Sequence, residues 1–265
     1  MKDKKAFSKE QIAAILVAMV LFCIVYFGFD IIPEEQKTLE KSRMLTTEAT
    51  SVQNLILDAQ EELGVKYGVI EAMAMELNSV ENDSLKIESL KSLSGKWYDL
   101  GYPEISAYYA EEVASLSNDP DSWSIAGTTY LLGVKNSQEE KTRQWSFNRA
   151  INAFETAISL DPEQIDNRIN LALGYIEMPP PDNPMKGILM LRELDIQYPG
   201  NVKVLAQLGR LSLETNQIEN AIKRLKQGEE IQPDNKKIIC LLAQAHEKAG
   251  NSIEAEKYNK KCIDN

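Results

Sequence analysis

The sequence predicts an all-α protein, with an N-terminal transmembrane helix followed by an α-solenoid of about four helix pairs and a degenerate pair that caps it. Three observations lead to this prediction. A run of eighteen residues without a charge occupies 12–29. Pro162, Pro199 and Pro233 recur at intervals of 37 and 34 residues, close to the period of a helix–turn–helix array. Large and small apolar residues also recur at matching places in each interval.

The uncharged run 12–29 is long enough to cross a bilayer, because eighteen helical residues extend roughly 27 Å. Lysines precede the run and carboxylates follow it, so residues 1–11 are predicted to form a cytoplasmic basic tail. The run is longer than the core of a cleaved signal peptide, and the bulky Phe22 argues against a lipid anchor at Cys23. We therefore predict a single-pass protein of the bacterial inner (cytoplasmic) membrane, with its N-terminus inside and the repeats in the periplasm.

The composition limits the class of partner. The chain has 265 residues and a formal net charge of −11, with 40 acidic and 29 basic residues. A negative chain repels phosphate backbones and anionic lipid surfaces, so we predict no nucleic-acid partner. The predicted partners are other proteins, together with the membrane that residues 12–29 would enter.

Residues 30–82 are predicted to form a helical neck. A heptad stripe of apolar residues runs along its first part, at Leu45, Ala49, Val52, Ile56, Ala59 and Leu63. Two interpretations are open. The stripe could form a parallel coiled coil and make the protein a homodimer through the neck, or it could pack on the next helix of the same chain, around 65–80. The short stripe and its alanines favour packing within the chain.

Residues 83–118 are predicted to form a degenerate helical repeat. Two helical segments are divided by Gly101-Tyr102-Pro103, and proline suits the first turn of the second segment. Terminal repeats of an array are usually atypical, so this pair is expected to cap the repeats on their N-terminal side.

The domain 119–265 holds the repeating pattern. Its first unit contains Trp123-x2-Ala126-Gly127-x2-Tyr130, followed by Ala150-x3-Phe154-x2-Ala157-x4-Pro162. This pattern resembles the tetratricopeptide repeat, a helix–turn–helix unit that stacks into α-solenoids. The units are placed at about 120–162, 163–199, 200–233 and 234–265. In the second unit Gly187 stands where the family has alanine, which permits close helix contact at a cost of about 1 kcal/mol in helix propensity.

Cys240 and Cys262 lie on the two helices of the last unit. Outside the cytoplasm they could form a disulfide, and otherwise they are two small buried apolar residues. The second interpretation is favoured, although the direction of the side chains decides the matter and sequence does not give it.

The resemblance implies a partner-binding groove lined by the first helix of each unit. Its groove-facing sites fall on Ser124, Thr128, Leu131, Asp166, Ile169, Leu173, Ile176, Lys203, Arg210, Leu213, Lys237, Gln244 and Glu247. The groove is expected to suit an extended or helical peptide with apolar side chains and an acidic end near Lys203, Arg210 and Lys237. The alternative is that these are ordinary solvated helix faces. The carboxylate clamp of the family's chaperone-binding members is not matched here.

The sequence predicts no enzyme, cofactor or metal site. His246 is the single histidine and occupies a site where the family packs an aromatic residue, so a buried or capping role is expected. No cysteine or histidine spacing fits a metal, and the glycines form no phosphate-binding loop.

The functional hypothesis is a membrane-anchored scaffold or chaperone-like adaptor for an envelope complex, which binds a peptide or helix in the groove. The layout resembles membrane-anchored tetratricopeptide proteins of the Bacteroidota, and bacterial inner-membrane repeat proteins that assist secretion or cytochrome c maturation. A first alternative is a structural spacer or oligomerisation element of a membrane complex without a peptide client. A second is a protein like the mitochondrial import receptors, against which the missing clamp counts.

Overall fold

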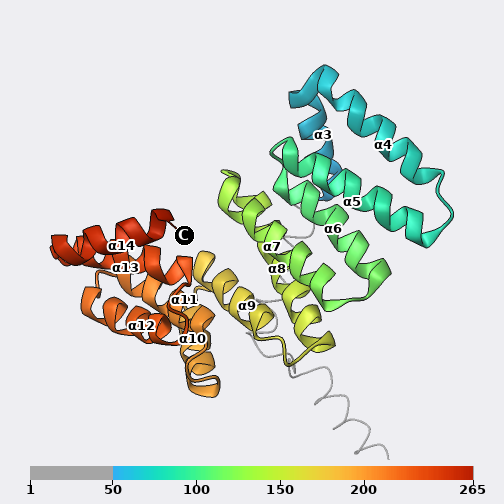
Figure 1. Cartoon of the computed structure of the whole chain (residues 1–265). Helices are drawn as coiled ribbons and strands as arrows, with labels where there is room; N and C mark the ends of the chain where they lie inside the picture. The colour runs from blue at the N-terminus through green and yellow to red at the C-terminus, as the bar shows by residue number, and fades with distance from the viewer. Residues whose placement is uncertain (1–49, 265) are drawn as a thin grey trace, which may run out of the picture. The chain divides into compact units, whose positions relative to one another are not determined.

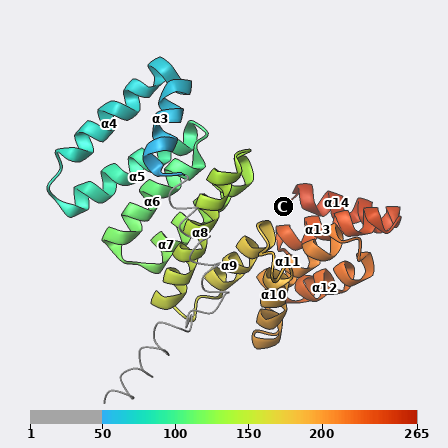
Figure 2. The same ribbon diagram turned by 180° about the vertical axis from the view of Figure 1, so that it is seen from behind.

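The computed structural model describes residues 50–264, and the all-α prediction is confirmed over this range, which contains no strand (Figure 1). The elements are α3 (Val52–Leu63), the 3-10 helix η1 (Gly64–Tyr67), α4 (Gly68–Asn78), α5 (Asp83–Asp99), α6 (Pro103–Ser117), α7 (Pro120–Asn136), α8 (Glu140–Leu160), α9 (Ile165–Glu177), α10 (Lys186–Gln197), α11 (Val202–Glu214), α12 (Ile218–Ile231), α13 (Lys236–Lys248) and α14 (Ser252–Asp264). From α4 onward each helix packs against the next one along the chain (Figure 1 and Figure 2).

The predicted tail 1–11 and transmembrane helix 12–29 lie outside the described residues, as does the first part of the neck. Among residues 50–264, no helix has the length and apolar character needed to span a bilayer. The predicted single-pass location in the inner membrane, with the repeats in the periplasm, is therefore not supported and is withdrawn. The envelope complex depended on that location and is withdrawn with it.

Side chains that accept hydrogen bonds from the first free backbone N–H groups fix where several helices begin. Asn82, Asn201 and Asn235 do this for α5, α11 and α13. Asp119 does it for α7, where Pro120 follows in the first turn. These capping residues fix the positions at which the helices begin, which hydrophobic periodicity alone does not locate.

The Asp119 cap gives a stability prediction. The Asp119 carboxylate accepts from Ser117 Oγ at 2.6 Å and from the Ser122 N–H at 3.0 Å, and these bonds lower its pKa to about 2. Because the folded pKa is depressed, the stabilisation is present above about pH 4 and is lost as the pH falls toward about 2. Asp119→Ala is expected to lower the free energy of unfolding at pH 7 by about 1 kcal/mol, measured by urea denaturation.

Asp119→Asn is the matched control, since asparagine is also a good cap but carries no charge. It should keep most of the stability at pH 7 and lose the dependence on pH between about 4 and 2. An alanine variant as stable as the wild type would contradict the cap.

The heptad stripe of the neck packs inside the chain over the part that the structure describes. Val52 and Ala59 are buried, and Ile56 and Leu63 pack against the same core cluster, which includes Trp97. At these positions the stripe packs within the chain, and α3 contacts η1 and α6 where the prediction had the helix around 65–80. Ile56 and Leu63 are half-buried.

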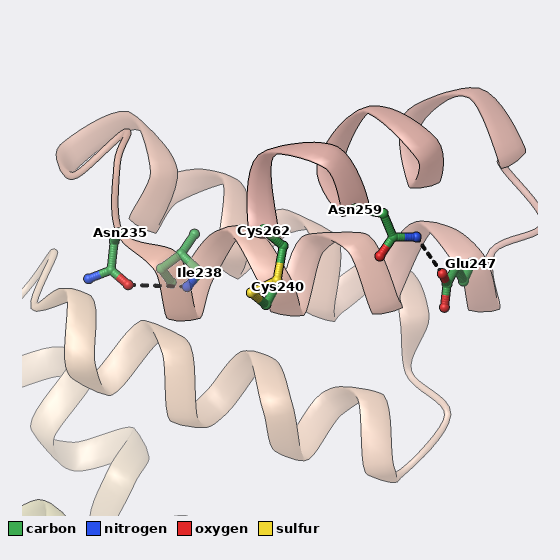
Figure 3. Close-up of a disulfide and its surroundings, with 6 residues drawn as sticks. All are labelled: Asn235, Ile238, Cys240, Glu247, Asn259 and Cys262. Atoms are coloured by element: carbon green, nitrogen blue, oxygen red, sulfur yellow. Dashed lines mark hydrogen bonds between the residues drawn. A yellow bond between two sulfur atoms is a disulfide. The ribbon is translucent and has the colours of Figure 1, made fainter. Parts of the chain in front are cut away.

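The two cysteines of the last unit form a disulfide that joins α13 to α14 (Figure 3). The Cα atoms of Cys240 and Cys262 are 5.0 Å apart, within the range that a disulfide bridges. This corrects the favoured interpretation of two unpaired thiols. Both side chains point into the space between α13 and α14, which could not be read from the sequence.

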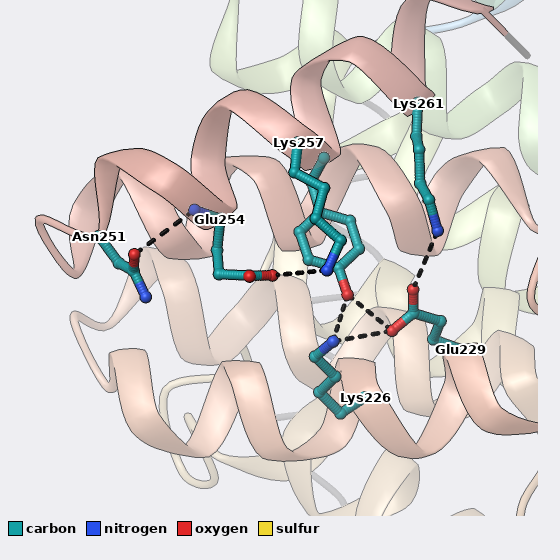
Figure 4. A network of polar contacts seen from close by, with 7 residues as sticks. Lys226, Glu229, Asn251, Glu254, Lys257 and Lys261 are labelled. Atoms are coloured by element: carbon teal, nitrogen blue, oxygen red, sulfur yellow. Dashed lines mark hydrogen bonds and ion pairs between the residues drawn. The ribbon is translucent and has the colours of Figure 1, made fainter.

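A polar network also ties α14 to α12 (Figure 4). Glu229 accepts hydrogen bonds from the Tyr258 hydroxyl at 2.8 Å and from Lys226 Nζ at 2.9 Å. Burial acts to raise the pKa of Glu229, but these two donors and the charge of Lys261 outweigh it and hold the pKa below its usual value. The last helix is thus attached both covalently and by charged hydrogen bonds.

His246 takes the buried role that the sequence predicts. Its ring stacks on that of Tyr258 with centroids 5.5 Å apart, and only 7% of the residue is exposed. Burial lowers the pKa of His246, so the neutral imidazole is favoured.

Candidate partner-binding surface

The predicted groove residues lie on the first helix of each pair, α7, α9, α11 and α13. Helix α7 contacts α9, and α11 contacts α13. An ion pair between Asp166 on α9 and Lys203 on α11 links the two middle helices. The four helices therefore form one series, held together by direct contacts and by this ion pair.

The thirteen predicted residues differ in their exposure to solvent. The exposed ones are Thr128, Lys203, Lys237, Gln244 and Glu247. The half-buried ones are Ser124, Leu131, Asp166, Leu173, Ile176 and Arg210. Ile169 and Leu213 are buried, each with 4% exposure. A partner can therefore reach the polar members more easily than the apolar ones.

The apolar members are used mainly for packing between neighbouring helix pairs. Ile169 belongs to a core cluster with Val204 and Leu208 of α11, and Leu213 belongs to the last cluster, with Ile239. Their expected place on a groove surface is corrected, because buried side chains cannot contact a partner. Leu173 and Ile176 pack against the first of these clusters and keep partial exposure.

The cations at the C-terminal end of the series differ in how far they are neutralised. Lys203 pairs with Asp166, and Arg210 pairs with Glu214 one turn further along α11. Lys237 takes part in no ion pair within residues 50–264. Although Lys237 is exposed, partial desolvation by its neighbours and the nearby charge of Arg210 lower its pKa.

Lys237 is thus a cation on α13 that is repelled by a second cation on α11 and forms no ion pair with a carboxylate among residues 50–264. A carboxylate bound between Arg210 and Lys237 would relieve this repulsion and accept charge-assisted hydrogen bonds from both. Among the predicted residues, this pair is the best candidate for recognition of an acidic group.

One further member of the set, Glu247, already contacts α14. Glu247 accepts a hydrogen bond from Asn259 Nδ2 at 2.6 Å (Figure 3). Asn259 stands where the family has phenylalanine, so a polar contact replaces an aromatic one between the last two helices. Gln244 is exposed on the same helix α13.

The structure also shows polar residues that the sequence pattern did not single out. Glu111 on α6 accepts from the Tyr130 hydroxyl at 2.5 Å and from Arg149 Nη1 at 2.6 Å. Burial and the Glu111 charge raise the pKa of Tyr130. The guanidinium of Arg149 also lies 4.9 Å from the centre of the Trp145 ring. This cluster joins α6, α7 and α8 and has a structural role.

Residues 202–235 match the family model of the tetratricopeptide repeat. The match covers α11, α12 and the turn after them. The chain therefore contains a tetratricopeptide repeat, and the predicted resemblance is confirmed for this segment. The resemblance to proteins of the Bacteroidota stays a prediction. None of the curated proteins matches the chain.

Two kinds of solved structure are similar at low identity. MamA from Desulfovibrio magneticus RS-1, residues 41 to the end, is 16% identical over 67% of this chain and 93% of its own, with a TM-score of 0.42. YrrB, described as a TPR protein with an unusual peptide-binding site, is 14% identical over 69% of this chain and 92% of its own, with a TM-score of 0.38.

Proposed function

We propose that this protein is an interaction scaffold, a chaperone-like adaptor that holds a peptide segment of another protein across α11 and α13. The observation that carries the proposal is the pair Arg210 and Lys237, in which Lys237 has no carboxylate partner within residues 50–264. The tetratricopeptide match supports it, because the matched segment includes Arg210 and begins one residue before Lys203.

The surface favours a peptide with an acidic group. Arg210 and Lys237 would hold the carboxylate, while the exposed Gln244 offers amide hydrogen bonds to a peptide backbone. Lys203 pairs with Asp166 and Arg210 pairs with Glu214, so Lys237 is the cation of these three that has no ion pair within residues 50–264. Leu173 and Ile176 supply a small apolar contact at the α9 side.

The second candidate is a structural spacer or oligomerisation element without a dedicated client. The burial of Ile169 and Leu213 favours it, because it removes two of the apolar contacts that a peptide groove would use. The two candidates differ in whether charge reversal on α11 and α13 changes which proteins are bound.

The test compares crosslinked partners of the full chain with those of the double variant Arg210→Glu/Lys237→Glu. Losing two charge-assisted hydrogen bonds should weaken peptide capture by about tenfold or more. The matched control is Lys223→Glu/Lys260→Glu, which makes the same charge change at exposed positions on α12 and α14.

The adaptor function predicts one set of proteins that the control retains and the α11/α13 variant loses. Retention of the same set by both variants would contradict the binding surface and favour the spacer. Equal loss from both would mean that net charge, and not this surface, governs capture.

A further inference from the structure

The first four described α-helices form a partly open cavity that the groove does not include. Its volume is about 430 Å³, and residues of α3, α4, α5 and α6 line it together with Val80 from the turn between α4 and α5. This size lies in the range of small-ligand and side-chain pockets. Val52, Ile56, Leu77 and Leu90 make part of its wall apolar, and polar groups supply the larger share of its exposed surface.

Polar groups also reach this cavity. Lys86, Tyr108 and Glu112 contribute to its lining, and Glu112 is exposed. Neither Lys86 nor Glu112 forms an ion pair within the described part of the chain. The pocket therefore combines apolar patches with two charged groups, Lys86 and Glu112, that form no ion pair with each other.

Apolar surface continues outside the cavity on the same helices. Leu57 on α3 is 58% exposed, Met75 on α4 is 64% exposed and Leu85 on α5 is 55% exposed. Helix α4 itself buries only Ile70. A small molecule would fill the cavity and leave these side chains in water, whereas a partner segment could cover both.

The charge of this part of the chain indicates what that segment should carry. Residues 50–118 contain twelve acidic and four basic residues. On α3 and α4, Asp58, Glu61, Glu71 and Glu76 are exposed and form no ion pair within residues 50–264. These carboxylates repel an acidic ligand or an anionic membrane and attract a cationic segment.

We propose that the α3–α6 cavity is a second binding site, which takes a large apolar side chain from a basic amphipathic helix of a partner protein. The apolar face of that helix would insert one residue into the cavity and cover Met75 and Leu57. Its lysines or arginines would meet the carboxylates of α3 and α4 and of Glu112. This mode resembles the docking of an amphipathic helix in a groove.

The test uses two fluorescein-labelled helical peptides and fluorescence anisotropy with the full chain. One peptide has a leucine and tryptophan face with lysines elsewhere, and the other has glutamates in place of the lysines. The lysine peptide is expected to bind, and the glutamate peptide to bind at least about tenfold more weakly. Equal binding of the two, or no binding of the lysine peptide, would overturn the proposal.

Substitution at one cavity position locates the site. Ala74→Trp places a large ring at the cavity wall, and it should weaken the lysine peptide by about tenfold or more. Ala72→Trp is the matched control, since Ala72 is exposed on the same helix and does not line the cavity. Equal affinity of the two variants would overturn the assignment to the cavity.

A charge change at the surface tests the same site if Ala74→Trp does not fold. Glu112→Lys changes an exposed cavity residue and should weaken the lysine peptide severalfold more than Glu88→Lys, an exposed change on α5 away from the cavity. No difference between these two would also contradict the proposal. The Arg210→Glu/Lys237→Glu variant should bind the lysine peptide as the wild type does. The cavity proposal and the proposed function at α11 and α13 can therefore be contradicted separately.

Discussion

Gly187→Ala is expected to lower the free energy of unfolding by about 3 kcal/mol, because a methyl group at this position has no room. A Cβ atom there would clash with the Ala172 carbonyl oxygen and lie 2.8 Å from the Ile176 backbone nitrogen. Neither backbone atom can rotate away, so α10 would have to move off α9. The gain in helix propensity from alanine is about 1 kcal/mol and offsets only part of the loss.

Urea denaturation of Gly187→Ala and Gly95→Ala measures this effect against a matched control. Gly95 lies inside α5, and a Cβ atom there would meet no other atom within 4 Å. Gly95→Ala should therefore raise the free energy of unfolding by about 0.5–1 kcal/mol. If Gly187→Ala is as stable as the wild type, the close packing of α9 on α10 is wrong.

Opening the disulfide is expected to have the second largest effect. Cys240 and Cys262 are separated by 22 residues, and closing a loop of this size stabilises a protein by about 3 kcal/mol in the chain-entropy description. The helices of an array contact mainly their neighbours, so the loss should be confined largely to α14. The bonds from Tyr258 and Lys226 to Glu229 (Figure 4) should keep α14 partly attached.

Amide hydrogen exchange with and without reductant tests this prediction. In the wild type, reduction should speed exchange in α14 and leave α5 to α8 unchanged. The control is Cys240→Ser/Cys262→Ser, which should show fast exchange in α14 under both conditions. Unchanged protection of α14 after reduction of the wild type would mean that the bond contributes little to holding the helix.

The sequence predicted the helical class well, because its signals are local. An Asp-Pro step stands at 119–120, where α7 begins, and a second at 161–162, directly after α8 ends. The tetratricopeptide pattern likewise indicated α11 and α12, where the family match falls. The predicted domain boundaries remain predictions.

The candidate surface was harder to predict, because it depends on contacts between distant residues. A pattern along α9 or α11 identifies a helix face, but stacking against the next pair decides that Ile169 and Leu213 are buried. Asp166 neutralises Lys203 across 37 residues of sequence. The cavity at α3–α6 depends on how α4 packs, and the disulfide depends on side-chain direction.

The most direct test of the proposed adaptor function is photo-crosslinking from Gln244, which is exposed on α13. A photoreactive residue replaces Gln244 in the full chain, and the crosslinked peptides are sequenced by mass spectrometry. Gln227, exposed on α12, serves as the control position. The proposed function predicts that position 244 captures one segment with acidic residues nearby, and that Arg210→Glu/Lys237→Glu abolishes this capture. Identical products from 227 and 244, or products that survive the charge reversal, would contradict it.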